Sequence, residues 1–168
     1  MRDALRDPAN RLLRAAHAAG LTVAVAESCT AGLLCQVLAD AEGAGTQFAG
    51  GFITYTKAQK TAALGVPAAL LAAKTAVCRE VASAMAEGVL LASAASAAAS
   101  ITGVAGPEPD EDGNPVGRVC IAVARRGTAT RAFEFNYGDL GRDAVRERAV
   151  ADALQALTDT VTAVSAAA

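Results

Sequence analysis

The sequence predicts an α/β protein, specifically a three-layer α/β/α sandwich around a mixed, mostly parallel sheet. Short apolar runs of strand length alternate with segments whose apolar residues recur every three or four positions, and this alternation is typical of helices that cover a sheet. Near the C-terminal end, two apolar runs follow each other across a glycine-containing turn at 125–127, which indicates an antiparallel hairpin. The 168 residues suffice for one sizeable core, so we expect a single domain over 1–168.

In the first part of the chain, signals for helices and strands alternate. Asp7 and Pro8 fit a helix N-cap followed by proline at the first helical position, and Gly20 fits the end of that helix. The unbroken apolar run 21–26 predicts a buried strand, and Phe52 and Ile53 belong to a second one. We expect strands over 21–26 and 48–56, and helices over about 8–19, 30–41, 57–64 and 67–73.

The second part of the chain completes the fold. Four apolar residues spaced four apart, starting just before residue 79, predict a core-facing helix over 79–95. They are Val77, Val81, Met85 and Val89. A short strand is expected over 98–102, followed by a loop over 103–116 that contains three prolines, three glycines and four acidic residues. Strands over 119–124 and 130–137 form the hairpin, and a long closing helix begins at about 141.

Composition narrows the classes of function. The net charge of −2 gives no electrostatic reason to expect nucleic acid as the main partner. The four cysteines lack a CxxC spacing and no secretory leader is recognisable, so we expect reduced thiols, a cytoplasmic location and no metal. The apolar run 89–99 is too short and too rich in serine to span a membrane. An alanine-rich, apolar surface favours a homo-oligomer.

The most informative feature is a polar corner at 27–32, Glu-Ser-Cys-Thr-Ala-Gly, between a predicted strand and a predicted helix. Backbone N–H groups at a helix start can bind an anion or the oxyanion that develops during acyl transfer. Ser28 is therefore a candidate nucleophile, although serine at such a position most commonly caps the helix. Cys29 is the second candidate for that role, provided that its thiolate is stabilised.

A serine nucleophile needs a base, and the sequence offers few. His17 is the single histidine and reads as an ordinary helix residue. Arginine cannot deprotonate, so Lys60 is the best candidate among three lysines, the others being Lys57 and Lys74. To act near pH 7, Lys60 needs a pKa lowered by desolvation or by a nearby positive group. Without that shift it is a solvated surface lysine.

Other polar residues stand at the ends of predicted elements. Thr102 and Gly103 end a short strand, where α/β sheets bind ligands, although Gly103 can also serve a turn that requires positive φ. Tyr55 combines an apolar ring with a hydroxyl group that can hydrogen-bond the serine and lysine. Arg142 starts the last helix, where it either covers the helix surface or binds a phosphate with two N–H groups. The acidic residues at 108–112 are more typical of a solvated loop than of a metal site.

Five groups of residues occur in an order and spacing that are specific to one family. They are 26–32 (Ala-Glu-Ser-Cys-Thr-Ala-Gly), 51–55 (Gly-Phe-Ile-Thr-Tyr) with Lys60, 76–77 with 80–82, 102–107 (Thr-Gly-Val-Ala-Gly-Pro) and 115–117 (Pro-Val-Gly). Over roughly residues 8–160, the chain resembles the C-terminal domain of the competence/damage-inducible protein A (CinA) family. It departs from that family at Ala31, where a second glycine is usual, and at 108–112, where acids replace a glycine-rich turn.

The resemblance implies an activity, because this family contains the nicotinamide-nucleotide amidohydrolases (NMN deamidases) of pyridine-nucleotide salvage. It implies no metal or organic cofactor and a small-molecule nucleotide as substrate. The roles implied are nucleophile for Ser28, base for Lys60, a supporting hydrogen bond for Tyr55, oxyanion binding near Cys29 and Thr30, and nucleotide binding by Thr102, Gly103 and Arg142. Two alternatives stay open: a nucleotide-binding module without turnover, and an interaction module of the competence and DNA-damage machinery.

Overall fold

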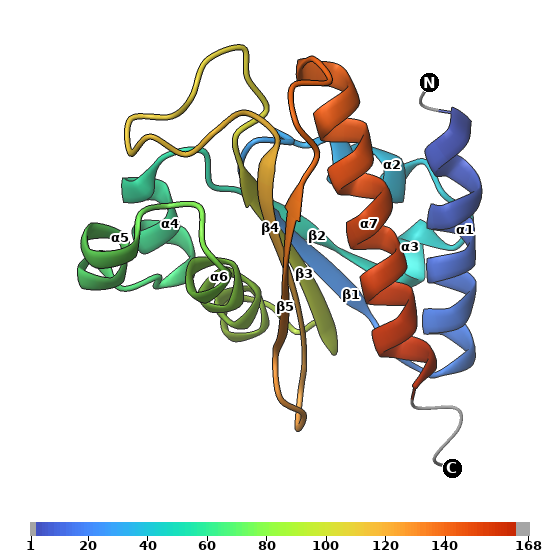
Figure 1. The fold of residues 1–168 in the computed structure, drawn as a ribbon. Helices are drawn as coiled ribbons and strands as arrows, with labels where there is room; N and C mark the ends of the chain where they lie inside the picture. The colour runs from blue at the N-terminus through green and yellow to red at the C-terminus, as the bar shows by residue number, and fades with distance from the viewer. Residues whose placement is uncertain (1–2, 164–168) are drawn as a thin grey trace.

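A five-stranded sheet forms the centre of the molecule in a computed structural model that describes residues 3–163 (Figure 1). The strand order across the sheet is β2-β1-β3-β4-β5. The strands are β1 Val23–Glu27, β2 Phe48–Ile53, β3 Ala97–Gly103, β4 Arg118–Arg125 and β5 Arg131–Asn136.

Most strands of this sheet point in the same direction. β1 pairs in parallel with β2 on one side and with β3 on the other, whereas the β3–β4 and β4–β5 pairs are antiparallel. Among these five strands, β4 is therefore the reversed one. The carboxyl ends of β1, β2 and β3 consequently meet at one edge of the sheet, where open α/β sheets bind their ligands.

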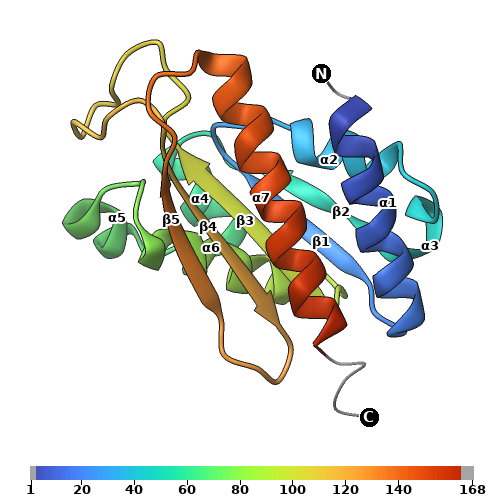
Figure 2. The same ribbon diagram turned by 45° about the vertical axis from the view of Figure 1, so that its right-hand side comes forward.

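Helices cover both faces of the sheet (Figures 1 and 2). One face carries α1 (Asp3–Ala18), α2 (Leu33–Ala39), α3 (Ala44–Gln47) and α7 (Arg142–Thr162). The other face carries α4 (Lys57–Leu64), α5 (Ala68–Lys74) and α6 (Arg79–Ala92). The predicted fold class, a three-layer α/β/α sandwich with a mixed sheet, is confirmed. Among the described residues, no helix has the length and apolar character needed to cross a membrane.

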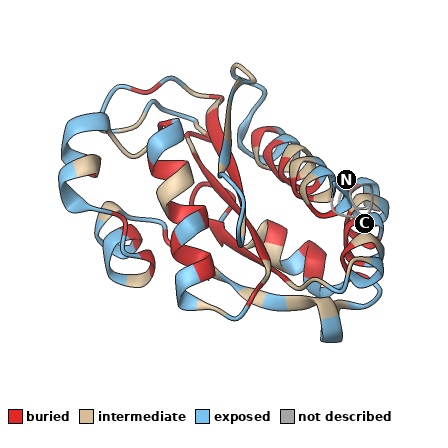
Figure 3. Cartoon of the chain, turned by 90° about the horizontal axis from the view of Figure 1, so that it is seen from below, coloured by how far each residue is buried: buried red, intermediate tan, exposed pale blue. Residues whose placement is uncertain are grey.

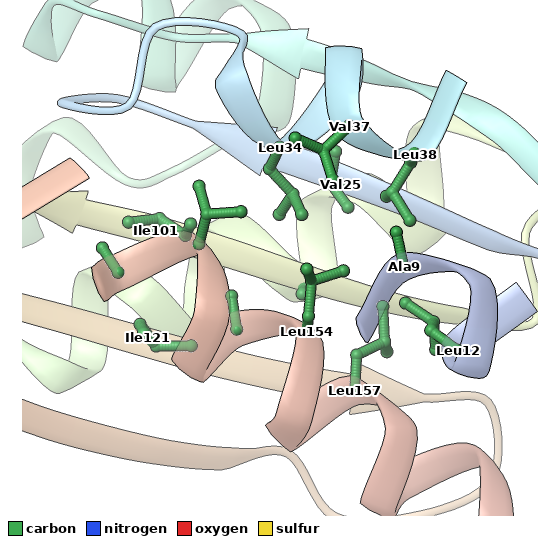
Figure 4. Packing of buried hydrophobic residues seen from close by; sticks show 14 of the residues in the cluster. Ala9, Leu12, Val25, Leu34, Val37, Leu38, Ile101, Ile121, Leu154 and Leu157 are labelled. Carbon is green, nitrogen blue, oxygen red and sulfur yellow. The ribbon is translucent and has the colours of Figure 1, made fainter. Parts of the chain in front are cut away.

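The core lies between the layers, and Figure 3 shows buried residues on the sheet and on the inner sides of the helices. On one face, Leu12, Leu38, Leu154 and Leu157 pack together from three helices (Figure 4). Each buried leucine side chain stabilises the fold by roughly 1.5–3 kcal/mol. On the other face, the four residues predicted to face the core from their spacing are all buried: Val77, Val81, Met85 and Val89.

Small residues bring the layers close together. The inner strands bury alanine on both faces, at Ala24, Ala26, Ala97, Ala98 and Ala99. On α6, a Cβ atom at Gly88 would overlap the carbonyl oxygen of Leu64, so α6 and α4 touch backbone to backbone. This contact fixes the position of α4, which carries the predicted base.

Several element boundaries differ from those that the sequence predicts. The strand expected over 48–56 ends at Ile53, because Thr56 already caps α4, and the helix expected over 79–95 ends at Ala92. The first helix begins at Asp3 and contains Pro8 in its interior, because Leu5 extends the buried stripe toward the N-terminus. Burial of Leu5 outweighs the loss of one N–H donor at Pro8. The helix expected over 30–41 is limited to α2, since residues 28–32 form a turn with positive φ at Ala31 (49°) and Gly32 (100°). β1 continues through Glu27, one residue further than expected.

We expect Gly88→Ala to lower the free energy of unfolding by about 1–3 kcal/mol, because overpacking forces the two helix backbones apart. Gly45→Ala in α3 is the matched control, since its new methyl group would meet nothing within 4 Å and its φ is not positive. Urea unfolding curves of both variants measure the difference. A Gly88→Ala protein as stable as the wild type would contradict the contact between α4 and α6.

Candidate active site

Ser28 and Lys60 form a buried pair at the carboxyl edge of the sheet. Ser28 directly follows β1, and Lys60 lies in the first turns of α4. The Lys60 Nζ atom lies 2.8 Å from Ser28 Oγ and 2.8 Å from the carbonyl oxygen of Thr54. The exposed fraction is 1% for Lys60 and 7% for Ser28. The structure thus brings the predicted nucleophile and base into hydrogen-bond contact.

Local sequence signals place Lys60 at this position. The predicted helix over 57–64 is the observed α4, with Thr56 as N-cap and Gly65 as C-cap in the left-handed region. The Thr56 side chain accepts a hydrogen bond from the N–H of Gln59, which satisfies one free donor of the first turn. Thr54, two residues before this cap, donates its N–H to the carbonyl oxygen of Glu27 at 2.8 Å. Lys60 is therefore tied to the end of β1 through Thr54.

The environment of Lys60 favours its neutral form. Desolvation by burial lowers the pKa of the Lys60 ammonium from 10.5 to about 8. A negative charge on Cys29 would raise that pKa, but burial raises the pKa of the Cys29 thiol to about 12, so the thiol is protonated at neutral pH. Within the described chain, no carboxylate forms an ion pair with Lys60. About a tenth of the molecules then hold a neutral amine at pH 7.

The pair opens into a cavity of about 430 Å³, a size typical of small-molecule sites. Its lining includes most of the predicted site residues: Ser28, Cys29, Tyr55, Lys60, Thr102, Gly103 and Arg142. Thr30 lines a second cavity instead, of about 410 Å³, between α2 and α7. Arg146 contributes to the lining of both cavities.

Tyr55 does not make the expected hydrogen bond to the pair. Its exposed fraction is 57%, and its hydroxyl group bonds to no residue in the described part of the chain. The second partner of the lysine amine is the main-chain carbonyl of Thr54. Tyr55 follows β2 on the rim of the cavity, because its neighbour in sequence, Thr54, takes the buried position.

Cys29 is poorly suited to act as the nucleophile. Its raised pKa leaves little thiolate at neutral pH, because burial penalises the charged form more than Arg146 and Lys60 stabilise it. Its carbonyl oxygen accepts a hydrogen bond from Nε of Arg146 at 2.8 Å. The main chain at Cys29 is therefore connected to α7, and the sulfur remains a buried neutral group.

The start of α2 is not free to bind an anion, contrary to the expectation from the sequence. The N–H groups of Gly32, Leu34 and Cys35 donate to the carboxylate of Glu27. The N–H groups of Cys29 and Thr30 differ, since they donate to no other described residue. These two donors follow Ser28 directly and are the ones expected to bind an oxyanion.

The three residues predicted to hold a nucleotide differ in whether they have a polar group available to bind it. The Thr102 hydroxyl group is buried and donates to the carbonyl oxygen of Ala76 at 2.8 Å. Gly103 has no positive φ; glycine is required there because a Cβ atom would lie 2.8 Å from the carbonyl oxygen of Arg118. Arg142 is exposed on the cavity wall, and its guanidinium group pairs with no described carboxylate.

Sequence reasoning did not assign two parts of the lining. Arg146 lies four residues after Arg142 on α7, and this helical spacing was the available signal. The acidic loop is the second part, since Glu108, Asp110, Glu111 and Asp112 all line the cavity. Lys57 binds two of these acids, with Nζ at 2.9 Å from Glu111 and 2.8 Å from Asp112. Over the described residues, no cluster of three or more His, Cys, Asp or Glu side chains is arranged to hold a metal ion.

Fold and site together define a class of protein: an α/β/α domain that holds a buried Ser–Lys pair at the carboxyl edge of a mixed sheet. The chain belongs to the CinA C-terminal domain family, whose family model matches residues 5–161. The resemblance inferred from the five motif groups is thereby confirmed.

Relatives in sequence carry the same family name. The chain is 45% identical over 147 residues to a CinA-like protein of Mycolicibacterium gilvum, covering 85% of the chain and 34% of the relative. It is 44% identical over 128 residues to a CinA-like protein of Geobacter sulfurreducens, covering 76% and 30%. The chain therefore spans about a third of the length of these relatives.

Solved structures of the family superpose closely. The competence/damage inducible protein CihA from Agrobacterium tumefaciens has a TM-score of 0.87 at 37% identity, over 91% of this chain and 93% of that one. A CinA superfamily protein from Escherichia coli has a TM-score of 0.87 at 32% identity, over 92% and 89%. Both matches extend over nearly the whole of each chain.

We expect Lys60→Met to change how stability depends on pH. The folded-state pKa of about 8 lies below the value of about 10.4 in the unfolded chain. Between these values the unfolded state binds more protons, so wild-type stability rises with pH. The free energy of unfolding of the wild type, relative to that of Lys60→Met, should rise by up to about 3 kcal/mol from pH 8 to 10.5. Below pH 8 this difference should not change with pH.

Urea unfolding at a series of pH values measures this difference. Lys74→Met, which removes an exposed lysine, controls for the loss of one positive charge. Parallel stability curves for wild type and Lys60→Met across this pH range would contradict a lowered pKa at Lys60.

Proposed function

We propose that this domain hydrolyses the carboxamide of nicotinamide mononucleotide, giving nicotinate mononucleotide and ammonia. The observation that carries the proposal is the buried Ser28–Lys60 pair, with 2.8 Å between Oγ and Nζ and a lysine pKa lowered to about 8. A neutral amine beside a hydroxyl group is the arrangement that activates a serine without histidine. Membership of the CinA C-terminal domain family supports a pyridine nucleotide as substrate.

In the acylation step, the neutral Lys60 amine takes the proton of the Ser28 hydroxyl group as Oγ attacks the carboxamide carbon. One N–H of the amine stays bonded to the carbonyl oxygen of Thr54, which orients its lone pair toward Ser28. The carboxamide oxygen becomes an oxyanion, and the unpaired N–H groups of Cys29 and Thr30 are the donors that stabilise it.

The remaining steps return the site to its starting state. The C–N bond breaks as the Lys60 ammonium gives its proton to the departing nitrogen, so ammonia leaves and an ester on Ser28 remains. Lys60 then accepts a proton from a water molecule, whose oxygen attacks the ester carbon. As the C–O bond breaks, the Lys60 ammonium returns that proton to Ser28 Oγ, which restores the hydroxyl group and the neutral amine. The released carboxylic acid loses its remaining proton to solvent and leaves as the nicotinate carboxylate.

Charges around the cavity fit a substrate with an anionic end. Arg142 and Arg146 both line the cavity, and guanidinium groups bind phosphate with paired N–H donors. Two of the loop acids, Glu111 and Asp112, are bound to Lys57, which reduces their repulsion of a phosphate group. The phosphate would bind toward α7, and the carboxamide toward Ser28.

We expect Ser28→Ala to lower ammonia release from nicotinamide mononucleotide by on the order of 10³-fold or more, because the attacking oxygen is lost. Binding of the nucleotide, measured by calorimetry, should persist. Cys29→Ser is the control and should stay active. Activity of Ser28→Ala within a few-fold of the wild type would exclude the serine mechanism. A wild-type protein that binds the nucleotide but releases no ammonia would identify a binding module.

Arg142→Ala is expected to weaken nucleotide binding and to leave bond cleavage largely intact. A charge-assisted hydrogen bond contributes roughly 1.5–3 kcal/mol, which corresponds to a loss of about ten- to a hundred-fold in affinity. The riboside, which has no phosphate, should be handled equally by variant and wild type. Arg148→Ala, also exposed on α7 but outside the cavity lining, is the matched control. Equal losses on nucleotide and riboside would assign Arg142 a structural role.

A further inference from the structure

Glu27 is a fully buried carboxylate that the proposed reaction does not use. It is the last residue of β1 and directly precedes Ser28. Its Oε2 accepts N–H bonds from Gly32 and Leu34 at 3.0 and 3.1 Å, and its Oε1 accepts one from Cys35 at 2.7 Å. A buried charge is strongly destabilising unless it is compensated by such bonds. Among the described residues, that compensation comes from these backbone donors and not from a cation.

These three bonds hold the turn that presents Ser28. Between β1 and α2 the chain passes through the left-handed region at Ala31 and Gly32, and this conformation is unfavourable for alanine by on the order of 1 kcal/mol. At its start, the turn is fixed by the Ser28 N–H, which donates to the carbonyl oxygen of Ile101 at 3.0 Å. At its end, the Glu27 carboxylate binds the beginning of α2 back onto β1.

The same residue also affects the donors and the base around Ser28. Cys29 and Thr30 lie inside the held turn, so the direction of their unpaired N–H groups depends on it. The main-chain carbonyl of Glu27 accepts the N–H of Thr54 at 2.8 Å, and the carbonyl of Thr54 accepts the Lys60 amine. The side chain of Glu27 thus orders the turn, while its main chain orders the segment that carries the base.

We propose that Glu27 is a positioning residue for acyl transfer, whose carboxylate holds residues 28–32 so that Ser28 Oγ and the N–H groups of Cys29 and Thr30 stay aligned. The proposal rests on the proposed function only in taking Ser28 as the nucleophile. It does not depend on which amide is the substrate.

Glu27→Gln tests this role, because glutamine offers one acceptor oxygen to three N–H donors and directs its own NH₂ group at them. The readout is the rate at which a fluorophosphonate probe labels Ser28, followed by intact mass. In that reaction Oγ forms a bond to phosphorus, fluoride leaves with the bonding electrons, and Lys60 accepts the serine proton. We expect labelling to slow by on the order of 10²-fold, as for a displaced reacting group.

Two comparisons separate positioning from a general loss of stability. Asn10→Ala removes a buried acceptor that binds the N–H of Glu42 after the end of α2, and it should label at the wild-type rate. Both variants are assayed well below their melting temperatures. Affinity for nicotinate mononucleotide should be nearly unchanged in Glu27→Gln, because Arg142, which is proposed to bind the phosphate, lies on α7 outside the turn. An equal slowing in Glu27→Gln and Asn10→Ala would overturn the proposal.

A second variant covers the case in which Glu27→Gln does not fold. Glu27→Asp keeps the charge but draws the carboxylate back by about one bond length, ~1.5 Å, and a folded Glu27→Asp that labels at the wild-type rate would overturn the proposal. A wild-type protein whose Ser28 is never labelled by the probe would also overturn the proposal. If the wild type is labelled but leaves nicotinamide mononucleotide intact, the proposed substrate is wrong, and the labelling rates still decide the role of Glu27.

Discussion

The site depends on keeping a buried acid and a buried base apart. Glu27 and Lys60 both lie in the interior beside Ser28, yet they form no ion pair with each other. Glu27 is satisfied by three backbone N–H donors, and Lys60 by one carbonyl and one hydroxyl oxygen. Had they paired, the carboxylate would hold the lysine pKa high and the amine would stay protonated. Because each group has its own hydrogen-bond partners, Lys60 is desolvated without a counter-ion. This condition lowers the pKa of its ammonium group toward neutral pH.

The topology of the sheet explains why these groups converge. Strands β1, β2 and β3 run in the same direction, so the residues that follow them meet at one edge. Ser28 follows β1, Thr54 follows β2, and Thr102 and Gly103 end β3. Antiparallel β4 then approaches Gly103 so closely that a side chain would not fit there. Strand direction therefore brings residues far apart in the sequence to one cavity, and α4 and α7 add Lys60 and Arg142 to it.

The sequence predicted those parts of the protein that local patterns determine. The bounds of α4 follow from a threonine N-cap and a glycine C-cap, and the core side of α6 follows from spacing. The start of α1 was missed, since Asp7 and Pro8 imitate a helix beginning while burial of Leu5 extends the helix. The role of Glu27 could not be predicted, because its carboxylate is buried only once α2 packs beside β1. Burial of Lys60 likewise arises from long-range packing.

Lys57 and Lys60 show how far environment decides the chemistry of a residue type. They lie three residues apart on α4 and have the same ordinary pKa as free side chains. Hydrogen bonds that Lys57 donates to the carboxylates of Asp112 and then Glu111 raise the pKa of its ammonium group, so it remains a cation that ties the acidic loop to α4. Burial without a carboxylate partner lowers the pKa of Lys60. Glu111 and Asp112 are bound by Lys57, so part of the negative charge of the loop is compensated away from the buried amine. One helix thus supplies a fixed cation for the wall of the cavity and a titratable amine for its interior.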